Sequence, residues 1–186
     1  MSEIHADRAA IDQFLRSHGA ATMPHPGGTL LEHLQRVSAT LAEWGTSDDV
    51  QIAGLCHAAY GTDGFAETLL DPADPASRGT LADLIGPRAE SLVHLYASCD
   101  RKATYPRLGT DRQPQFRDRF AAADIIPAHE DLRAFLDITA ANELDVLKHN
   151  ADLRSRYGPA LHRLFARVAD HLSPAAWHAA RVLGET

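Results

Sequence analysis

The chain has 186 residues, 45% of them hydrophobic, and a formal net charge of -7. This length and composition are sufficient for a single domain over residues 1–186 with one continuous core. The negative charge argues against a nucleic-acid-binding surface, because phosphate contacts require clustered lysine and arginine. No run of about 18 apolar residues predicts a membrane span, and the charged N-terminus does not resemble a signal peptide. We therefore expect a cytoplasmic protein that contacts neither membrane nor nucleic acid.

Apolar residues recur at helical spacing along the chain without sustained alternation, which predicts an all-α fold. The first strongly amphipathic helix is predicted over residues 29–44, with Gly45 as its stop. The next is predicted to begin at Ser47 as its N-cap and to end at Gly61. Its crowded apolar composition indicates burial on most sides, so we expect it to be the central helix of a compact bundle.

The middle of the chain is predicted to be less regular. Residues 71–79 are rich in helix breakers and predict a loop, after which Thr80 is expected to cap a short helix to Ile85. Gly86 and Pro87 restart a helix to about Asp100. Residues 101–114 predict a long connection, of a kind that often covers a site. Three closing helices are predicted over residues 129–148, 157–172 and 174–183.

Two of the eleven histidines stand out by position. His33 lies in the middle of the first amphipathic helix, and His57 lies near the end of the predicted central helix. Their separation suits one histidine from each of two neighbouring antiparallel helices that converge on a shared cavity. Buried imidazoles need hydrogen-bond partners. Taken alone, the pair is better explained as hydrogen-bonded histidines packed in the core than as a functional site.

The order of the surrounding motifs resembles the HD-domain superfamily of metal-dependent phosphohydrolases and related oxygenases. LLEHLQRV contains His33, AGLCHAAYG contains His57, and FLDITAANELDVLKH is similar to the late helix that carries the last aspartate ligand. The segment LIGPRAESLVHLYASCDR resembles the intervening helix of alarmone hydrolases. The match is closer to a little-characterised HD-like family with GxTLLxHL, AGLxHxxYGTxxF and a late AN pair. This resemblance spans about residues 25–149 and implies a compact HD-like helical bundle.

The sequence departs from the HD pattern at two metal ligands. Ala58 and Asn142 stand where the resemblance implies aspartates. Two neutral imidazoles and an amide lack the anionic charge that favours retention of a divalent ion. The resemblance therefore implies either no cofactor or one weakly held divalent metal, with His33, His57 and Asp63 as its ligands. Asp63 and Asp100 are both candidates for a replacement carboxylate.

The leading hypothesis is a small-molecule enzyme that uses histidine acid–base chemistry in an HD-like pocket, as a hydrolase, lyase, isomerase or cyclase. In it Tyr60 donates a hydrogen bond to a developing oxyanion, or else simply packs at the helix end. Asn142 orients a carbonyl group or a histidine tautomer. The expected catalytic residues are His33, His57, Tyr60, Asp63 and Asn142, and the expected substrate-binding residues are His25, Arg101 and Lys102.

Two alternatives remain open from the sequence. In the first, a divalent ion activates water against a phosphoester, and Arg101 and Lys102 steady the phosphate group. In the second, a non-catalytic protein has kept the HD scaffold for ligand binding or as plain core. Glu143, next to Asn142, is interpreted as part of a surface ion pair and receives no role. The sequence does not determine the oligomeric state.

Overall fold

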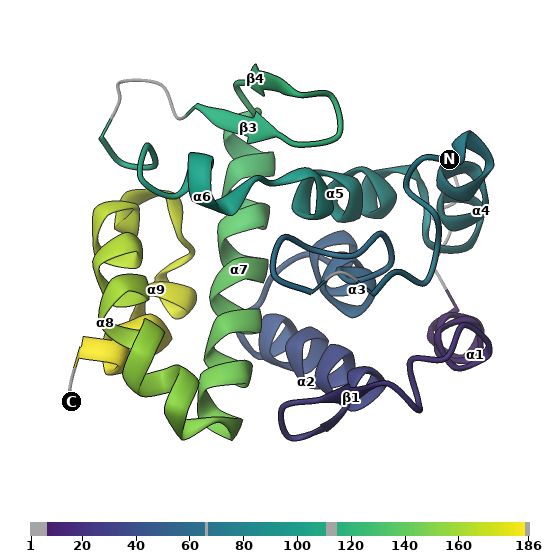
Figure 1. The fold of residues 1–186 in the computed structure, drawn as a ribbon, viewed down its shortest axis with the longest axis horizontal. Helices are drawn as coiled ribbons and strands as arrows, with labels where there is room; N and C mark the ends of the chain where they lie inside the picture. Colours follow the sequence, from purple (N-terminus) through teal and green to yellow (C-terminus); the bar gives the residue numbers. More distant parts are fainter. Residues whose placement is uncertain (1–6, 66, 111–114, 185–186) are drawn as a thin grey trace. The chain divides into compact units, whose positions relative to one another are not determined.

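A computed structural model of the protein describes residues 7–65, 67–110 and 115–184. The chain divides into two compact units, Met1–Ala97 and Ser98–Thr186, called here the first and second units. Helices predominate in both units (Figure 1). The described residues also form two short antiparallel sheets of two strands each, so the strictly all-α prediction is wrong in this respect. None of the helices in the described ranges combines the length and apolar composition needed to cross a membrane.

The first unit consists of helices and one small hairpin. In chain order its elements are α1 (Arg8–Ser17), β1 (Pro24–His25), β2 (Gly28–Thr29), α2 (Leu30–Glu43), α3 (Asp48–Cys56), α4 (Pro75–Ile85) and α5 (Pro87–Ser98). Strands β1 and β2 pair through Pro24 with Thr29 and His25 with Gly28. Sequence periodicity missed this hairpin because two-residue strands are too short to show an alternating pattern.

Helix α2 begins and ends where its sequence predicts. Thr29 is the N-cap, and its hydroxyl accepts a hydrogen bond from the backbone of Glu32 while the Glu32 carboxylate accepts one from the backbone of Thr29. This capping box satisfies two backbone donors that the helix itself leaves unpaired, and it holds the pKa of Glu32 below its usual value. Trp44 follows as the C-cap, and Gly45 takes a φ of 71°.

Helix α3 packs directly against α2 (Figure 1). Ser47 occupies the predicted N-cap position, although within the described residues its side chain makes no capping hydrogen bond. The helix is shorter than predicted, since it ends at Cys56 and His57 is its C-cap. A turn then leads to Gly61, whose φ of 69° favours glycine.

The prediction of a loop over residues 71–79 is wrong in its second half. Helix α4 already begins at Pro75, and the N-cap is Asp74, whose carboxylate accepts a hydrogen bond from the backbone of Ala76. Proline at the first helical position lacks only an N–H that would have no helical partner there. Thr80 is therefore an interior residue of α4, and its hydroxyl donates to the carbonyl of Ala76.

The second unit contains one long helix and several shorter elements. These are α6 (Arg101–Thr104), β3 (Phe116–Asp118), β4 (Ala123–Ile125), α7 (His129–His149), α8 (Ala151–Arg167), the 3-10 turn η1 (Ala169–His171), α9 (Pro174–Ala180) and the 3-10 turn η2 (Arg181–Gly184). The predicted long connection over 101–114 includes the short helix α6, and its last four residues, 111–114, lie outside the described ranges. Helix α7 matches its prediction closely. Helix α8 starts six residues earlier than predicted because Asn150 caps it through the backbone of Leu153.

A buried carboxylate joins α7 to the start of α9 in the second unit. Asp137 accepts a hydrogen bond from the backbone of Ser173, the N-cap of α9, at 2.9 Å. Burial raises the pKa of Asp137, and the hydrogen bonds from Ser173 and the charge of Arg133 oppose this shift only in part. The charged form of Asp137 is thus less favourable in the folded protein than in the unfolded chain.

Replacement of Asp137 by asparagine is expected to stabilise the second unit at pH 7. The pKa of Asp137 is higher in the folded protein than in the unfolded chain. Below the unfolded-state pKa, Asp137 is protonated and neutral in both states, so its burial costs no charge. As the pH rises through the folded-state pKa, the buried carboxylate becomes charged and the free energy of unfolding falls. The amide keeps an acceptor for Ser173 without a charge. Melting temperatures of both proteins should therefore be closest near pH 4 and diverge toward pH 7 in favour of the variant. Asp83→Asn is the control, because Asp83 is exposed, and it should leave the melting temperature nearly unchanged at every pH. If Asp83→Asn raised the melting temperature toward pH 7 as much as Asp137→Asn does, burial of Asp137 would not explain the effect.

Candidate functional site

Three imidazole rings lie in consecutive contact in the first unit. His33 comes from α2, His57 follows α3, and His25 belongs to β1. The ring centroids of His25 and His33 are 4.0 Å apart, and those of His33 and His57 are 5.3 Å apart with their planes at 81°. The structure thus brings together the two histidines singled out in the sequence and adds His25. His33 is 0% exposed and His57 2% exposed, whereas His25 is half-buried.

The hydrogen bond of His57 defines which of its ring nitrogens carries a proton. Its Nδ1 lies 2.7 Å from the backbone carbonyl of Gly54, one turn back in α3. A carbonyl can only accept, so Nδ1 is the donor, and in the neutral ring Nε2 is the basic nitrogen, with the in-plane lone pair. The edge of this ring also meets Tyr96 of α5, with centroids 5.1 Å apart. His57 is thereby held in one orientation and one tautomer.

The β1–β2 hairpin carries His25 against His33. Arg36 of α2 donates hydrogen bonds to the carbonyl of Pro26, at 3.2 Å, and to that of Gly27, at 3.4 Å. The ring of Phe65 meets His25 edge-on, with centroids 5.6 Å apart. The hairpin is also joined to α2 through the backbone, because β2 runs directly into α2 at Thr29 and the N–H of Leu30 donates to the carbonyl of Met23 at 2.8 Å. Its two strands pair over only two residues each.

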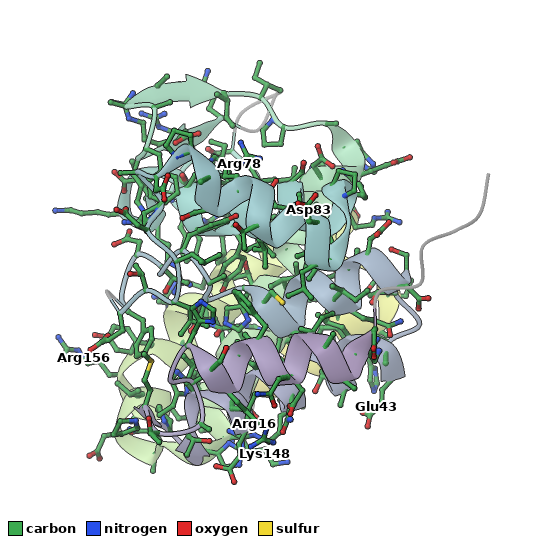
Figure 2. The ribbon with its side chains drawn as sticks, turned by 90° about the vertical axis from the view of Figure 1, so that its right-hand side faces the viewer. Arg16, Glu43, Arg78, Asp83, Lys148 and Arg156 are labelled. Carbon is green, nitrogen blue, oxygen red and sulfur yellow. The ribbon has the colours of Figure 1, made fainter. Side chains whose placement is uncertain are left out.

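Tyr60 lies in a different group of side chains, centred on Glu90 of α5. The buried Tyr60 hydroxyl donates to Glu90 at 3.0 Å, and Arg78 of α4, labelled in Figure 2, donates through Nε and Nη2 at 2.7 Å each. Burial, together with the charge and hydrogen bond of Glu90, raises the pKa of Tyr60. The Tyr60 hydroxyl proton is therefore donated to Glu90 and not to a substrate oxyanion in this structure. Sequence reasoning missed Glu90, since its only signal was a carboxylate in the first turn of a helix.

Asp63 lies in a tight turn next to the hairpin of the first unit. Thr62 and Phe65 exchange backbone hydrogen bonds of 2.8 and 3.1 Å around it. Its side chain is half-buried. Because Phe65 contacts His25, this turn and the hairpin adjoin each other.

The remaining candidate residues belong to the second unit. Two of them, Arg101 and Asn142, meet at Glu143, which had received no role from the sequence. Glu143 accepts hydrogen bonds from Arg101 at 3.0 Å and from Asn142 at 3.2 Å. Glu143 thus forms an ion pair, as expected, but the pair is partly buried and not on the open surface, since the Glu143 side chain is only 14% exposed. Lys102 is exposed, and Asp100 caps α6 by accepting from the backbone of Ala103. In the sequence, only the adjacency of Asn142 and Glu143 pointed to this cluster of Arg101, Asn142 and Glu143.

The HD resemblance implies a carboxylate ligand at position 58, and the first unit has Ala58 there. In the part of the chain that the structure describes, no group of three or more histidine, cysteine, aspartate or glutamate side chains is placed to hold a metal. An ion between His33 and His57 would be a buried double charge, and Ala58 offers no carboxylate to offset it.

Comparison with known proteins gives one partial match. Residues 14–101 match a family model described as a domain of unknown function, DUF6817. The matched segment covers less than half of the chain and includes His25, His33 and His57. No curated protein and no solved structure matches the chain.

Proposed function

We propose that the first unit is an HD-like acid–base site in which His25, His33 and His57 act on a small molecule. The observation that carries this proposal is the continuous contact of three imidazole rings, from the half-buried His25 to the buried His57. Imidazole takes up and releases protons near neutral pH. Such an array suits a hydrolase, lyase, isomerase or cyclase reaction, in which a proton is removed at one step and returned at another.

In this proposal His57 is the general base. Its Nδ1–H is held by the carbonyl of Gly54, so Nε2 is the atom that takes a proton from the substrate or from water. The same carbonyl stabilises the imidazolium that results. His33 is the second proton-transfer group. Tyr60 is a positioning residue, because its hydroxyl anchors the turn after α3 to Glu90.

The proposed route to the buried histidines runs past the β1–β2 hairpin. The half-buried His25 lies against His33, and the hairpin is joined to α2 by the chain at Thr29, by the Leu30–Met23 backbone hydrogen bond and by Arg36. A small molecule would reach His33 and His57 when this hairpin moves aside. Burial of the two histidines then excludes bulk water from the reaction, which strengthens electrostatic interactions with the substrate.

A non-catalytic, ligand-binding role is the second candidate. The specific observation that favours it is the burial of His33 and His57, at 0% and 2% exposed, since closely packed imidazoles also serve as hydrogen-bonded core residues. In this case the hairpin would still admit a small ligand, but no bond of the ligand would change.

Incubation of the protein with a mixture of cellular small molecules, followed by mass spectrometry, tests the proposal. The wild type should consume at least one compound, and His57→Gln should reduce that rate about 100-fold or more, the usual contribution of a general base. His18→Gln is the matched control, because His18 also has its Nδ1 on a backbone carbonyl, that of Phe14 at 2.8 Å, but is exposed.

Each outcome separates the candidates. Equal consumption by wild type and His57→Gln would contradict the acid–base assignment. A compound that is retained unchanged by the wild type and lost by the variant would favour the ligand-binding role. Stoichiometric metal in the wild type that disappears in a His33→Ala, His57→Ala double variant would contradict metal-free chemistry.

A further inference from the structure

A second histidine pair lies in the second unit, outside the site described above. His129 is the first residue of α7 and is exposed, and His171 is the last residue of η1. Their ring centroids are 5.7 Å apart, with the planes at 55°. The two rings therefore join the start of the longest helix to the turn that precedes α9.

The Nδ1 atom of His171 is buried, and among the described residues it has no hydrogen-bond partner. Buried polar atoms nearly always have a partner, and one without it costs free energy whether it is a donor or an acceptor. By contrast, the Nδ1 of His149 in the same unit lies 2.8 Å from the carbonyl of Asp145. His171 thus has a ring nitrogen with no hydrogen-bond partner among the described residues, on a ring whose centroid lies 5.7 Å from that of His129.

The spacing of the two rings matches joint coordination of one ion. Metal–nitrogen distances of about 2.0–2.1 Å place the ring centroids of two histidines on one tetrahedral ion roughly 5–6 Å apart. Imidazole is the preferred protein ligand of zinc, copper and nickel ions. Unlike His33 and His57, this pair has one exposed ring, that of His129, so water can complete the coordination shell from that side.

The charges around the pair also favour a cation. Glu130 and Asp131 lie in the first turn of α7, and the exposed Asp170 precedes His171 in the chain. These carboxylates offset the positive end of the α7 dipole, which alone would repel a cation. We propose that His129 and His171 bind a divalent transition-metal ion of the imidazole-preferring class, Zn²⁺, Ni²⁺ or Cu²⁺, and that this ion fastens η1 to the start of α7.

Zinc titration calorimetry on the full chain without an affinity tag tests this site. The wild type should bind one equivalent of Zn²⁺. His129→Gln and His171→Gln should each weaken zinc binding roughly tenfold or more, because loss of a ligand costs at least as much affinity as loss of a residue that only orients a ligand. His162→Gln is the matched control, because His162 lies in the same unit but its ring stacks on Trp177. A His33→Gln, His57→Gln double variant should bind zinc as the wild type does.

Absence of zinc binding would overturn the proposal, as would binding that survives His171→Gln or is lost in the His33, His57 double variant. A measurement on the wild type covers the case in which a variant fails to fold. Substoichiometric Cu²⁺ should selectively broaden the ring proton signals of His129 and His171 in NMR spectra, and unchanged signals would overturn the site. Neither result bears on the acid–base chemistry proposed for the first unit.

Discussion

Replacement of Arg78 by methionine is expected to lower the free energy of unfolding by about 3 kcal/mol, the low end of the cost of removing one partner from a buried ion pair. Glu90 has a side chain only 5% exposed and would lose both of its N–H donors from Arg78. Arg78 itself is 44% exposed, so water screens part of the interaction and the loss of unfolding free energy is expected at the low end of the range for buried ion pairs. Urea denaturation followed by circular dichroism measures the change as a lower midpoint at constant slope.

The ion pair of Arg16 with Asp12 provides the matched control. It is equally short, at 2.6 Å, but its side chains are 50% and 30% exposed. Because exposed helix pairs of this kind contribute only about 0.3–0.5 kcal/mol, Arg16→Met should have a correspondingly small effect. Figure 2 labels both arginines. A double variant, Arg78→Met with Glu90→Gln, should recover part of the loss because the buried group is then neutral. Similar small losses from both arginine variants would contradict the assignment of Glu90 as a buried anchor.

Replacement of Gly54 by alanine is expected to destabilise the first unit by about 2 kcal/mol, within the usual cost of overpacking a core. A Cβ atom at this position would overlap the side chain of Leu41, which is fully buried on α2. Either Leu41 would have to leave its present conformation or α2 and α3 would have to separate. The carbonyl of Gly54 would carry His57 with it, so NMR contacts between the rings of His33 and His57 should weaken as well.

Gly79→Ala is the control for this prediction. Gly79 is an exposed interior residue of α4, and apart from its chain neighbours and the backbone of its own helix no described atom lies within 4 Å of a Cβ built there. Alanine should therefore stabilise the protein at that position by roughly 0.5–1 kcal/mol through helix propensity. In a Leu41→Ala background, Gly54→Ala should lose most of its cost because the new methyl group enters the space that Leu41 left. A stabilising effect of Gly54→Ala alone would show that α2 and α3 can separate without cost.

The candidate site was predictable to the extent that its residues lie on regular helices. His33 was found because its position on the apolar stripe of α2 follows from helical periodicity, and its proximity to His57 follows from the packing of successive helices. His25 was named only from a loop, so its contact with His33 had no periodic signal. Glu90 and Glu143 were missed because a carboxylate on a helix is usually solvated, and only its partners reveal that it is buried.

The sequence by itself determined the predominance of helices, the limits of α2 and α7, and the placement of two histidines on neighbouring elements, because these depend on local periodicity and capping. The tertiary structure alone decided where the polar atoms find partners. It committed Tyr60 to Glu90, fixed the tautomer of His57 on Gly54, joined Arg101 to Glu143 and left Nδ1 of His171 without a partner among the described residues. The physical reason is that such hydrogen bonds join residues far apart in the chain or depend on the packing around them, so no local pattern encodes them.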